Sequence, residues 1–351
     1  MTKRKIKFNQ AINEAIYQSM KTDKSIICYG LGVTDPRRVF YSTENLVEAF
    51  GKERVFDTPT SENALTGIAV GLANLGSKVI FSHQRVDFSF LSMDQIINSL
   101  SKWHYMFGGQ RNLSITIRMI IGRGWGQGPT HSQSYQSFFA KIPGLKVVMP
   151  SNPHNAKGLL ISSIKDPDPV IFLEHRWLYD LSDNVPIKKY DLKLGKCNII
   201  NKGKDLTIVS MSNSTHEIVG MKKFFQDNKI SAEVIDLLSV SPIDMKTISN
   251  SVKKTGKLLI LDTCHKSFST GKEIISNISE NNLNYFKSKP ILMGMPNVPT
   301  PTGYSLTKKY YPSKKDVARE IMKLLNRKKI IWKNINEMRE HDKPKEFIGP
   351  F

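Results

Sequence analysis

The stretch DTPTSENALTGIAVGLANLG, residues 57–76, decides how the first half of this chain folds. Apolar side chains recur in it at spacings of three and four, which predicts a helix with one stripe buried against a core: Leu65, Ile68, Leu72 and Leu75. Residues 59–61 supply turn and cap residues before the first turn, and Gly76 ends the helix. The apolar run KVIF follows as a strand.

Glu62 stands in the first turn of this helix, and its carboxylate has two interpretations. It can complement the helix dipole while remaining ionised and solvated, which stabilises a helix by roughly 0.3 to 1 kcal/mol. Alternatively it can be buried, since burial raises a carboxyl pKa by up to about 3 to 5 units and prepares the group to share a proton with a ligand. The spacing alone leaves both interpretations open.

Composition indicates a globular protein with room for two domains. The chain has 351 residues, of which 40% are hydrophobic and 23% charged. Its 51 basic and 31 acidic residues give a net charge of +20. The basic residues are scattered, so we interpret the charge as solvated surface, with an acidic protein partner as the functional alternative. Because no basic stripe carries interleaved aromatic residues, a basic scaffold or nucleic-acid-binding protein is a distant alternative.

The cysteines and the N-terminal segment favour a cytoplasmic protein. Cys28, Cys197 and Cys264 have no paired spacing and lie in or beside apolar runs, which is typical of buried thiols in a reducing compartment. The first residues have a basic flank but no apolar segment of a signal peptide behind it. No run approaches the length of a membrane span.

Helical and strand patterns alternate along the chain in two series. In the first, helices near residues 8–20, 62–75, 93–106 and 152–163 separate the strands SIICYG, KVIFS, LSITIRMII, LKVVMP and PVIFLEH. After a polar linker over residues 180–193, helices near 216–226, 245–254, 271–278 and 316–325 separate DLTIVSM, AEVIDLL, KLLILDT and PILMGM. We therefore predict an α/β fold of two doubly wound domains, a mainly parallel one over 1–185 and a smaller one over 186–328, followed by a basic tail over 329–351.

The loop GRGWGQGPTHSQS, residues 122–134, is the second segment that could carry chemistry. Its glycines permit positive φ and a close approach of the backbone to a ligand. His131 follows them and is either a general acid or base near neutral pH or an exposed loop residue. Dinucleotide, P-loop, nucleophile-elbow and zinc motifs are missing, and so is a GDG segment followed by an Asn.

Several separated segments resemble the beta subunit of the decarboxylating component of 2-oxoacid dehydrogenase complexes, such as the pyruvate and branched-chain enzymes. They are RVFDTPTSENALTGIAVG, DQIINSLSKWHYMFGGQ, THSQSYQSFFAKIPGLKVVMPSNPHNAKGLL and KDPDPVIFLEH. AEVIDLLSVSPID and VKKTGKLLILD resemble the C-terminal, transketolase-like domain of this family, so the similarity covers residues 5–325. The resemblance implies that residues 1–185 form a domain that binds the pyrimidine of thiamine diphosphate.

The resemblance also implies roles for three residues. Glu62 falls on the glutamate that hydrogen-bonds the ring nitrogen of the thiamine aminopyrimidine and so promotes deprotonation of the thiazolium carbon. Phe88 falls on the aromatic residue that packs on the aminopyrimidine, although by itself it also reads as a core phenylalanine. His131 falls on a histidine near the thiazolium, where it handles a proton during acyl transfer.

A potassium site is implied on a separate set of positions. Relatives bind the ion with residues that correspond to Ile115, Ser163, Ile164, Asp166 and Asp168. The Asp-Pro-Asp-Pro sequence over 166–169 is equally well explained as turn chemistry.

The missing GDG segment agrees with this resemblance, because a separate alpha subunit holds the diphosphate and magnesium in that family. An alpha2-beta2 heterotetramer and a lipoyl acyltransferase partner are implied, with acyl transfer to a lipoyl carrier. A transketolase-like synthase that joins the same carbanion to an aldehyde is the alternative. Several segments depart from the family pattern: Leu31 and Gly32 replace an acidic pair, and His83, Gln84 and Arg85 replace an apolar stretch. LDTCHKSFSTGKEI lacks the usual Asp-Glu-Ala-His, and the tail from Ile330 to Phe351 is divergent.

Overall fold

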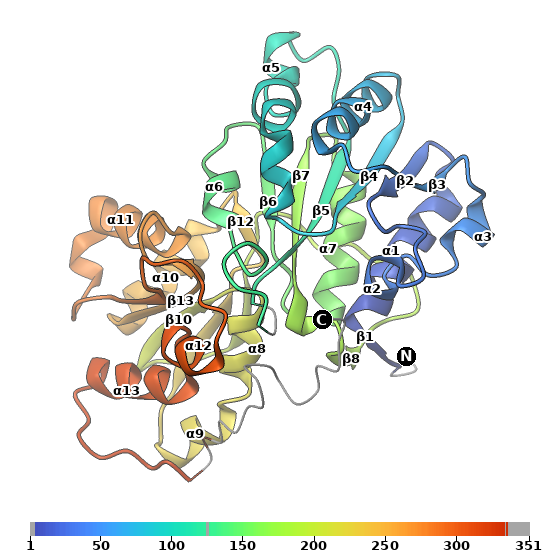
Figure 1. The fold of residues 1–351 in the computed structure, drawn as a ribbon. Helices are drawn as coiled ribbons and strands as arrows, with labels where there is room; N and C mark the ends of the chain where they lie inside the picture. The colour runs from blue at the N-terminus through green and yellow to red at the C-terminus, as the bar shows by residue number, and fades with distance from the viewer. Residues whose placement is uncertain (1–3, 124–125, 334, 336–351) are drawn as a thin grey trace.

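The computed structural model describes residues 4–123, 126–333 and 335, and it contains two main sheets (Figure 1). The larger sheet has seven strands in the order β12-β6-β7-β5-β4-β2-β3. Six of them are parallel: β2 (Ile26–Gly30), β3 (Val55–Asp57), β4 (Lys78–His83), β5 (Ile115–Ile121), β6 (Lys146–Val148) and β7 (Val170–His175). Both faces of this sheet are covered by helices, which confirms a doubly wound N-terminal domain.

Helices from different parts of the chain cover the two faces. On one face, α1 (Phe8–Thr22) packs along α7 (Pro153–Lys165). The other face is covered by α4 (Glu62–Asn74), the π-helical segment η2 (Gln95–Leu100) and α6 (Gln136–Ala140). Smaller elements complete the domain: α2 (Arg38–Tyr41), α3 (Leu46–Phe50), η1 (Phe88–Ser92), α5 (Trp103–Met106), η3 (Arg176–Leu178) and the antiparallel pair β1 (Lys5–Lys7) and β8 (Ser182–Asn184). Helix α2 is one left-handed turn, since its four residues have φ between 46° and 67°.

The second sheet has five strands in the order β14-β13-β10-β11-β9. Strands β10 (Leu206–Ser210), β11 (Ala232–Asp236), β13 (Leu258–His265) and β14 (Ile291–Met295) are the four predicted ones and run parallel, while β9 (Asn198–Asn201) is antiparallel. The surrounding helices are α8 (Asn213–Val219), α9 (Lys222–Asp227), α10 (Met245–Thr255), α11 (Thr270–Asn282), η4 (Leu283–Tyr285), α12 (Tyr304–Tyr310) and α13 (Lys314–Leu324). The predicted tail lies outside the described residues from 336 onward.

The two units are joined more closely than a linker alone would join them. Strand β12 (Ser239–Ser241) follows β11 of the second sheet but pairs antiparallel with β6, at the edge of the first sheet. One hydrophobic core runs from α4 and β5 through to β10 and α11. The predicted linker is also fixed, because the buried Lys157 donates to the carbonyl oxygens of Pro186, Ile187 and Lys188.

The structure corrects three sequence predictions. The helix over 93–106 is divided into η2 and α5, and that over 216–226 into α8 and α9 at Gly220. Helix α4 ends before Gly76 as expected, but its buried side coincides only in part with the predicted stripe. Leu65 is buried together with Thr66, Ala69, Val70 and Ala73, whereas Ile68 and Leu75 are 49% and 84% exposed. Two members of the predicted stripe, Ile68 and Leu75, therefore lie on the surface, whereas Leu65 is buried and Leu72 packs partly against the core.

Two further observations concern the environment of the chain. No helix in the described ranges is long and apolar enough to cross a membrane. All three cysteines are free thiols as predicted, and Cys28 and Cys264 are buried, whereas Cys197 is only partly buried.

A buried carboxyl group connects the two units at the end of β11. Asp236 accepts hydrogen bonds from Asn155 (3.2 Å), Thr215 (3.1 Å) and Ser151, and two of these donors belong to the N-terminal unit. Burial raises the pKa of Asp236 to about 7, although its three side-chain donors act in the opposite direction. The folded protein therefore holds a proton here that an unfolded aspartate releases near pH 4.

This proton predicts a pH-dependent contribution to stability. Asp236 binds more protons in the folded than in the unfolded state, so its contribution falls as the pH rises from about 4 to about 7. Burial lowers the pKa of His83 and His175 to about 3, and these residues act oppositely because the unfolded chain binds their protons. Asp236→Asn should therefore make unfolding free energy rise more steeply with pH over this window, by at most roughly 1.4 kcal/mol per pH unit. Urea unfolding of both proteins from pH 4.5 to 7 measures the difference, and parallel curves would contradict it.

Candidate active site

The carboxyl ends of the parallel strands meet at one edge of the larger sheet, where α/β proteins bind ligands. Strand β3 is followed by the turn that leads to Glu62, and strand β4 by Arg85 and Phe88. Strand β5 leads into the loop that carries His131, and β7 is followed by Arg176. The topology therefore directs most of the predicted site residues to one edge.

Glu62 is the first residue of α4 and is only 6% exposed. Ser61 occupies the N-cap position but makes no side-chain capping bond. Within the described part of the chain, no hydrogen bond or ion pair reaches the Glu62 carboxylate, and only its backbone carbonyl is bound, by the hydroxyl of Thr66 (2.8 Å). Glu62 as a residue is thus mostly buried, as the second interpretation expects, while its carboxylate oxygens keep some contact with solvent. A buried carboxylate without a protein partner is suited to a ligand that brings its own donor.

Phe88 and His131 lie in contact. Their ring centroids are 5.4 Å apart at an interplanar angle of 82°, an edge-to-face arrangement. Both side chains are half-buried, and η1, which begins at Phe88, packs against α4. The structure thus brings Phe88 and His131 together, and the segment η1 that begins at Phe88 packs against the helix that carries Glu62.

Hydrogen-bonded polar groups link Asp87, the residue before Phe88, to the end of loop 122–134. The Gln133 amide donates to Oδ1 of Asp87 (2.5 Å), and the Tyr135 hydroxyl donates to Gln133. The other carboxylate oxygen of Asp87 is buried and has no hydrogen-bond partner among the described residues. Burial raises the pKa of Asp87, while the Gln133 bond and the nearby Arg85 and His131 charges lower it. No local sequence pattern indicates Asp87, Gln133 or Tyr135 as site residues, because their contact depends on the folding of two distant segments.

A steric clash explains why the first residue of the loop, Gly122, is a glycine. Gly122 has φ of +84°, and a Cβ atom there would lie 2.2 Å from Nε2 of the buried His175. Its backbone N–H donates to the carbonyl oxygen of Gln133 (3.0 Å), which closes the base of the loop. Loop 122–134 is therefore fixed at its base, two residues from His131.

The predicted potassium positions lie at the opposite edge of the sheet, where β5 begins and α7 ends. The Lys146 ammonium group contacts the carboxylates of Asp166 (2.6 Å) and Asp168 (2.9 Å). The Ser114 hydroxyl contacts the carbonyl oxygens of Asp166 (2.7 Å) and Ile164 (3.4 Å), so these two oxygens point to a common position. Among the described residues there is no group of three or more His, Cys, Asp or Glu side chains that could hold a metal ion. The predicted potassium positions therefore lie apart from the site that contains Glu62 and His131.

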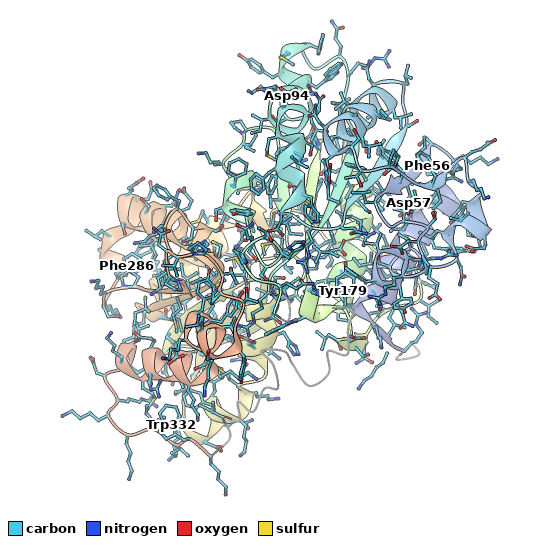
Figure 2. All side chains as sticks on the ribbon, viewed as in Figure 1. Phe56, Asp57, Asp94, Tyr179, Phe286 and Trp332 are labelled. Carbon is cyan, nitrogen blue, oxygen red and sulfur yellow. The ribbon has the colours of Figure 1, made fainter. Side chains whose placement is uncertain are left out.

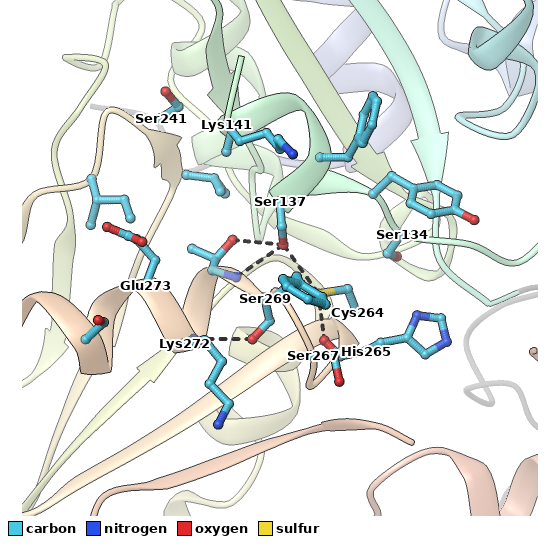
Figure 3. Close-up of a pocket in the computed structure, with 18 of the residues that line it drawn as sticks. Ser134, Ser137, Lys141, Ser241, Cys264, His265, Ser267, Ser269, Lys272 and Glu273 are labelled. Atoms are coloured by element: carbon cyan, nitrogen blue, oxygen red, sulfur yellow. Dashed lines mark hydrogen bonds between the residues drawn. The ribbon is translucent and has the colours of Figure 1, made fainter. Parts of the chain in front are cut away.

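A cavity of about 960 Å³ lies between α6 and the start of α11 (Figure 3). Its lining includes Ser134, Ser137, Cys264 and Phe268 but not Glu62, Phe88 or His131. The first N–H groups of α11 are already bound: Thr270 donates to Ser137 (3.2 Å) and Gly271 to the Asp262 carboxylate (3.0 Å). Burial raises the pKa of the Cys264 thiol, which keeps it protonated and unreactive. This cavity is therefore not the candidate site.

Comparison with known proteins identifies two family matches along the chain. Residues 4–181 match the family described as "Transketolase, pyrimidine binding domain", and residues 195–317 match "Transketolase, C-terminal domain". The chain is similar to the acetoin:2,6-dichlorophenolindophenol oxidoreductase subunit beta of Cupriavidus necator, with 36% identity over 90% of this chain and 96% of that protein. It is also similar to the pyruvate dehydrogenase E1 component subunit beta of Bacillus subtilis, with 34% identity over 90% and 97% of the two chains.

A solved structure supports the same fold. The protein titled "Split gene transketolase, inactive beta4 tetramer" covers 92% of this chain and 99% of its own, with a TM-score of 0.73 and 20% identity. The sheet topology and the position of the candidate site at the carboxyl ends of the parallel strands thus define a transketolase-type, two-domain α/β protein. More particularly, the chain belongs to the family of beta subunits that includes those of pyruvate dehydrogenase E1 and acetoin oxidoreductase.

Proposed function

We propose that this chain is the beta subunit of a thiamine diphosphate-dependent 2-oxoacid dehydrogenase. The observation that carries the proposal is Glu62, a carboxylate that is buried at the ligand edge of the sheet and has no partner in the described chain. The curated relatives named as beta subunits at about 35% identity support the reaction class. Thiamine diphosphate, when bound, supplies a carbanion that a protein side chain cannot form.

The residues of this chain then have three roles. Glu62 holds a proton at the ring nitrogen of the aminopyrimidine, and its burial keeps water from competing for that contact. Phe88 packs against the pyrimidine face and is itself supported by the edge-to-face contact with His131. His131 is a candidate proton donor and acceptor for the acyl group, since it is half-buried and in contact with Phe88. Magnesium and the diphosphate belong to a partner, because the chain has no GDG segment.

The surface beside Glu62 supports an alpha subunit as this partner. Ala64, Ile68, Gly71 and Leu75 lie on the exposed side of α4 at spacings of four, three and four, as in a helix that packs against another helix. Two further exposed apolar side chains, Leu91 and Tyr105, follow in η1 and α5, and α5 lies at the same end of the molecule as α4 (Figure 1). An alpha2-beta2 assembly in which this stripe is covered would also complete the pocket over Glu62.

The experiment that tests this function is reconstitution with the alpha chain encoded nearest to it. The complex should release carbon dioxide from a 2-oxoacid only when both chains and thiamine diphosphate are present. Product analysis with a lipoyl domain and with an aldehyde as acceptors separates a dehydrogenase with a lipoyl acyltransferase partner from a carboligating synthase. Failure of both reactions with a range of 2-oxoacids would refute the proposal.

A potassium ion fits the candidate positions through carbonyl oxygens and not through carboxylates. Asp166 and Asp168 already hold Lys146, whereas the carbonyl oxygens of Ile164 and Asp166 converge on the Ser114 hydroxyl. If the ion binds there, potassium chloride should raise the melting temperature above that in choline chloride at equal ionic strength. An ion present at 100 times its Kd stabilises by about 2.7 kcal/mol. Equal melting temperatures in the two salts would exclude this site.

A further inference from the structure

Arg85 connects the end of strand β4 to the loop that carries His131. It belongs to the segment that departs from the family pattern, and its side chain is only 5% exposed. One guanidinium nitrogen, Nη1, donates to the backbone carbonyl oxygen of His131, and Nη2 donates to the side-chain oxygen of Gln127. A single side chain thus binds loop 122–134 at two positions that are four residues apart.

Gln127 is itself shared between two arginines. Nη1 of Arg176, which follows β7, donates to the same amide oxygen. The loop is therefore attached to the ends of two different strands of the sheet, in addition to the backbone bond between Gly122 and Gln133 at its base. Arg85 is the member of this group that also reaches His131.

The physical need for such an attachment follows from the sequence of the loop. Gly122, Gly126 and Gly128 all have positive φ, and glycine loses more conformational freedom on ordering than any other residue. A guanidinium group has several N–H donors in a rigid plane, so two of its nitrogens can hold two acceptors in a fixed relation, whereas an ammonium group offers all its donors from one nitrogen. Burial lowers the pKa of Arg85 to about 10, so the group remains charged at neutral pH.

We propose that Arg85 is a positioning residue for the reaction: it fixes the backbone of His131 and thereby the place of the imidazole ring against Phe88. This inference rests on the role proposed for His131 above. Arg85 acts through the loop and does not touch the reacting atoms. The contacts of Arg85 with the loop lie within this chain. Their effect can therefore be measured both by turnover and by a method that does not depend on turnover.

The test compares Arg85→Met with Arg54→Met in the full chain reconstituted with its alpha partner. Arg54 is a matched control, because its guanidinium also donates to backbone carbonyls, those of Met20, Asp23 and Ile26, but at the opposite edge of the sheet. Misplacing a catalytic group by about 1 Å can lower a rate 10²-fold, so Arg85→Met should lower kcat by about that factor. The KM for the 2-oxoacid should stay within about threefold, since binding of the ground state does not depend on His131. Arg85→Lys can satisfy only one of the two acceptors well. Its kcat should therefore lie between that of the wild type and that of Arg85→Met.

Hydrogen exchange supplies a readout that does not depend on activity. In Arg85→Met the amides of residues 126–133 should exchange faster while those of β5 keep their protection, which shows that the variant is folded. In Arg54→Met the loop amides should be unchanged. The inference is overturned if Arg85→Met keeps a kcat close to that of the wild type, or if its loop exchange does not change.

A separate variant distinguishes this inference from the proposed function. If His131→Ala turns over normally, the role of His131 is wrong and Arg85 cannot act through it, although the exchange data would still report the attachment of the loop. If His131→Ala is slow and Arg85→Met is not, the proposed function survives and the positioning role does not.

Discussion

Glu62→Gln is expected to leave the chain folded and to remove most of the activity of the reconstituted complex, by about 10²- to 10⁴-fold in kcat. The amide has the size and shape of the carboxyl but cannot exchange a proton with the ring nitrogen of the aminopyrimidine. Because the carboxylate has no hydrogen-bond or ion-pair partner in the described chain, the amide breaks no contact of the folded protein. The melting temperature of the chain without cofactor should therefore be equal or higher, a loss of function without a loss of stability.

Glu53→Gln is the matched control for this prediction. Glu53 is an exposed carboxylate of the same domain, nine residues before Glu62 in the chain. Its replacement should change neither kcat nor the melting temperature appreciably, since surface substitutions are usually within about 0.5 kcal/mol. Turnover of Glu62→Gln at the rate of this control would remove Glu62 from the mechanism, and a large drop in melting temperature would show that the carboxylate has a structural role instead.

The sequence predicted the parallel strands and most helices because their patterns are local. Alternation of short apolar runs with amphipathic segments specifies a doubly wound fold wherever both faces of a sheet are buried. Strand β12 was not predicted, since three residues before a proline carry no periodic signal and their pairing with β6 depends on contact between the two units. The division of the helix over 93–106 was also not visible, because η2 keeps the apolar spacing of a longer helix.

The surface side of α4 illustrates a limit of periodicity. Leu65, Ile68, Leu72 and Leu75 form a regular apolar stripe, yet small residues such as Ala69 and Ala73 make the contact with the sheet. A stripe that packs in another chain has the same spacing as one that packs in the core, so the sequence cannot distinguish them. The burial of Glu62 at the start of the same helix was left open for a similar reason. It depends on the packing of η1 and the neighbouring strand ends against that turn.

In the candidate site, too, features set by local sequence could be predicted, whereas contacts between distant segments could not. Glu62, Phe88 and His131 could be selected because each lies in a recognisable segment. The contacts of Arg85 with Gln127 and His131 join residues more than forty positions apart, and nothing in either segment indicates the other. A residue that departs from the family pattern thus became interpretable only when the fold placed it beside the loop.

The largest expected effect on stability comes from a buried ion pair between β5 and β7. The guanidinium group of Arg118 donates to both carboxylate oxygens of Glu174, at 2.6 and 3.0 Å, and both side chains are fully buried. Ser42 accepts from Arg118 (2.8 Å), and the hydroxyl of Tyr179, labelled in Figure 2, donates to Glu174. Burial alone would lower the pKa of Arg118, but the Glu174 charge outweighs it and the pKa lies above its usual value.

Arg118→Met should therefore lower the free energy of unfolding by about 3 to 5 kcal/mol, because it leaves the Glu174 carboxylate buried without its counter-charge. Glu174→Met should have an effect of similar size through the unpaired guanidinium group. The double variant Arg118→Met/Glu174→Met should recover much of this loss, since removing both charges also removes their desolvation cost. Denaturant unfolding of the four proteins gives the coupling energy, and additive losses in the double variant would show that packing volume, and not charge pairing, sets the stability of this part of the core.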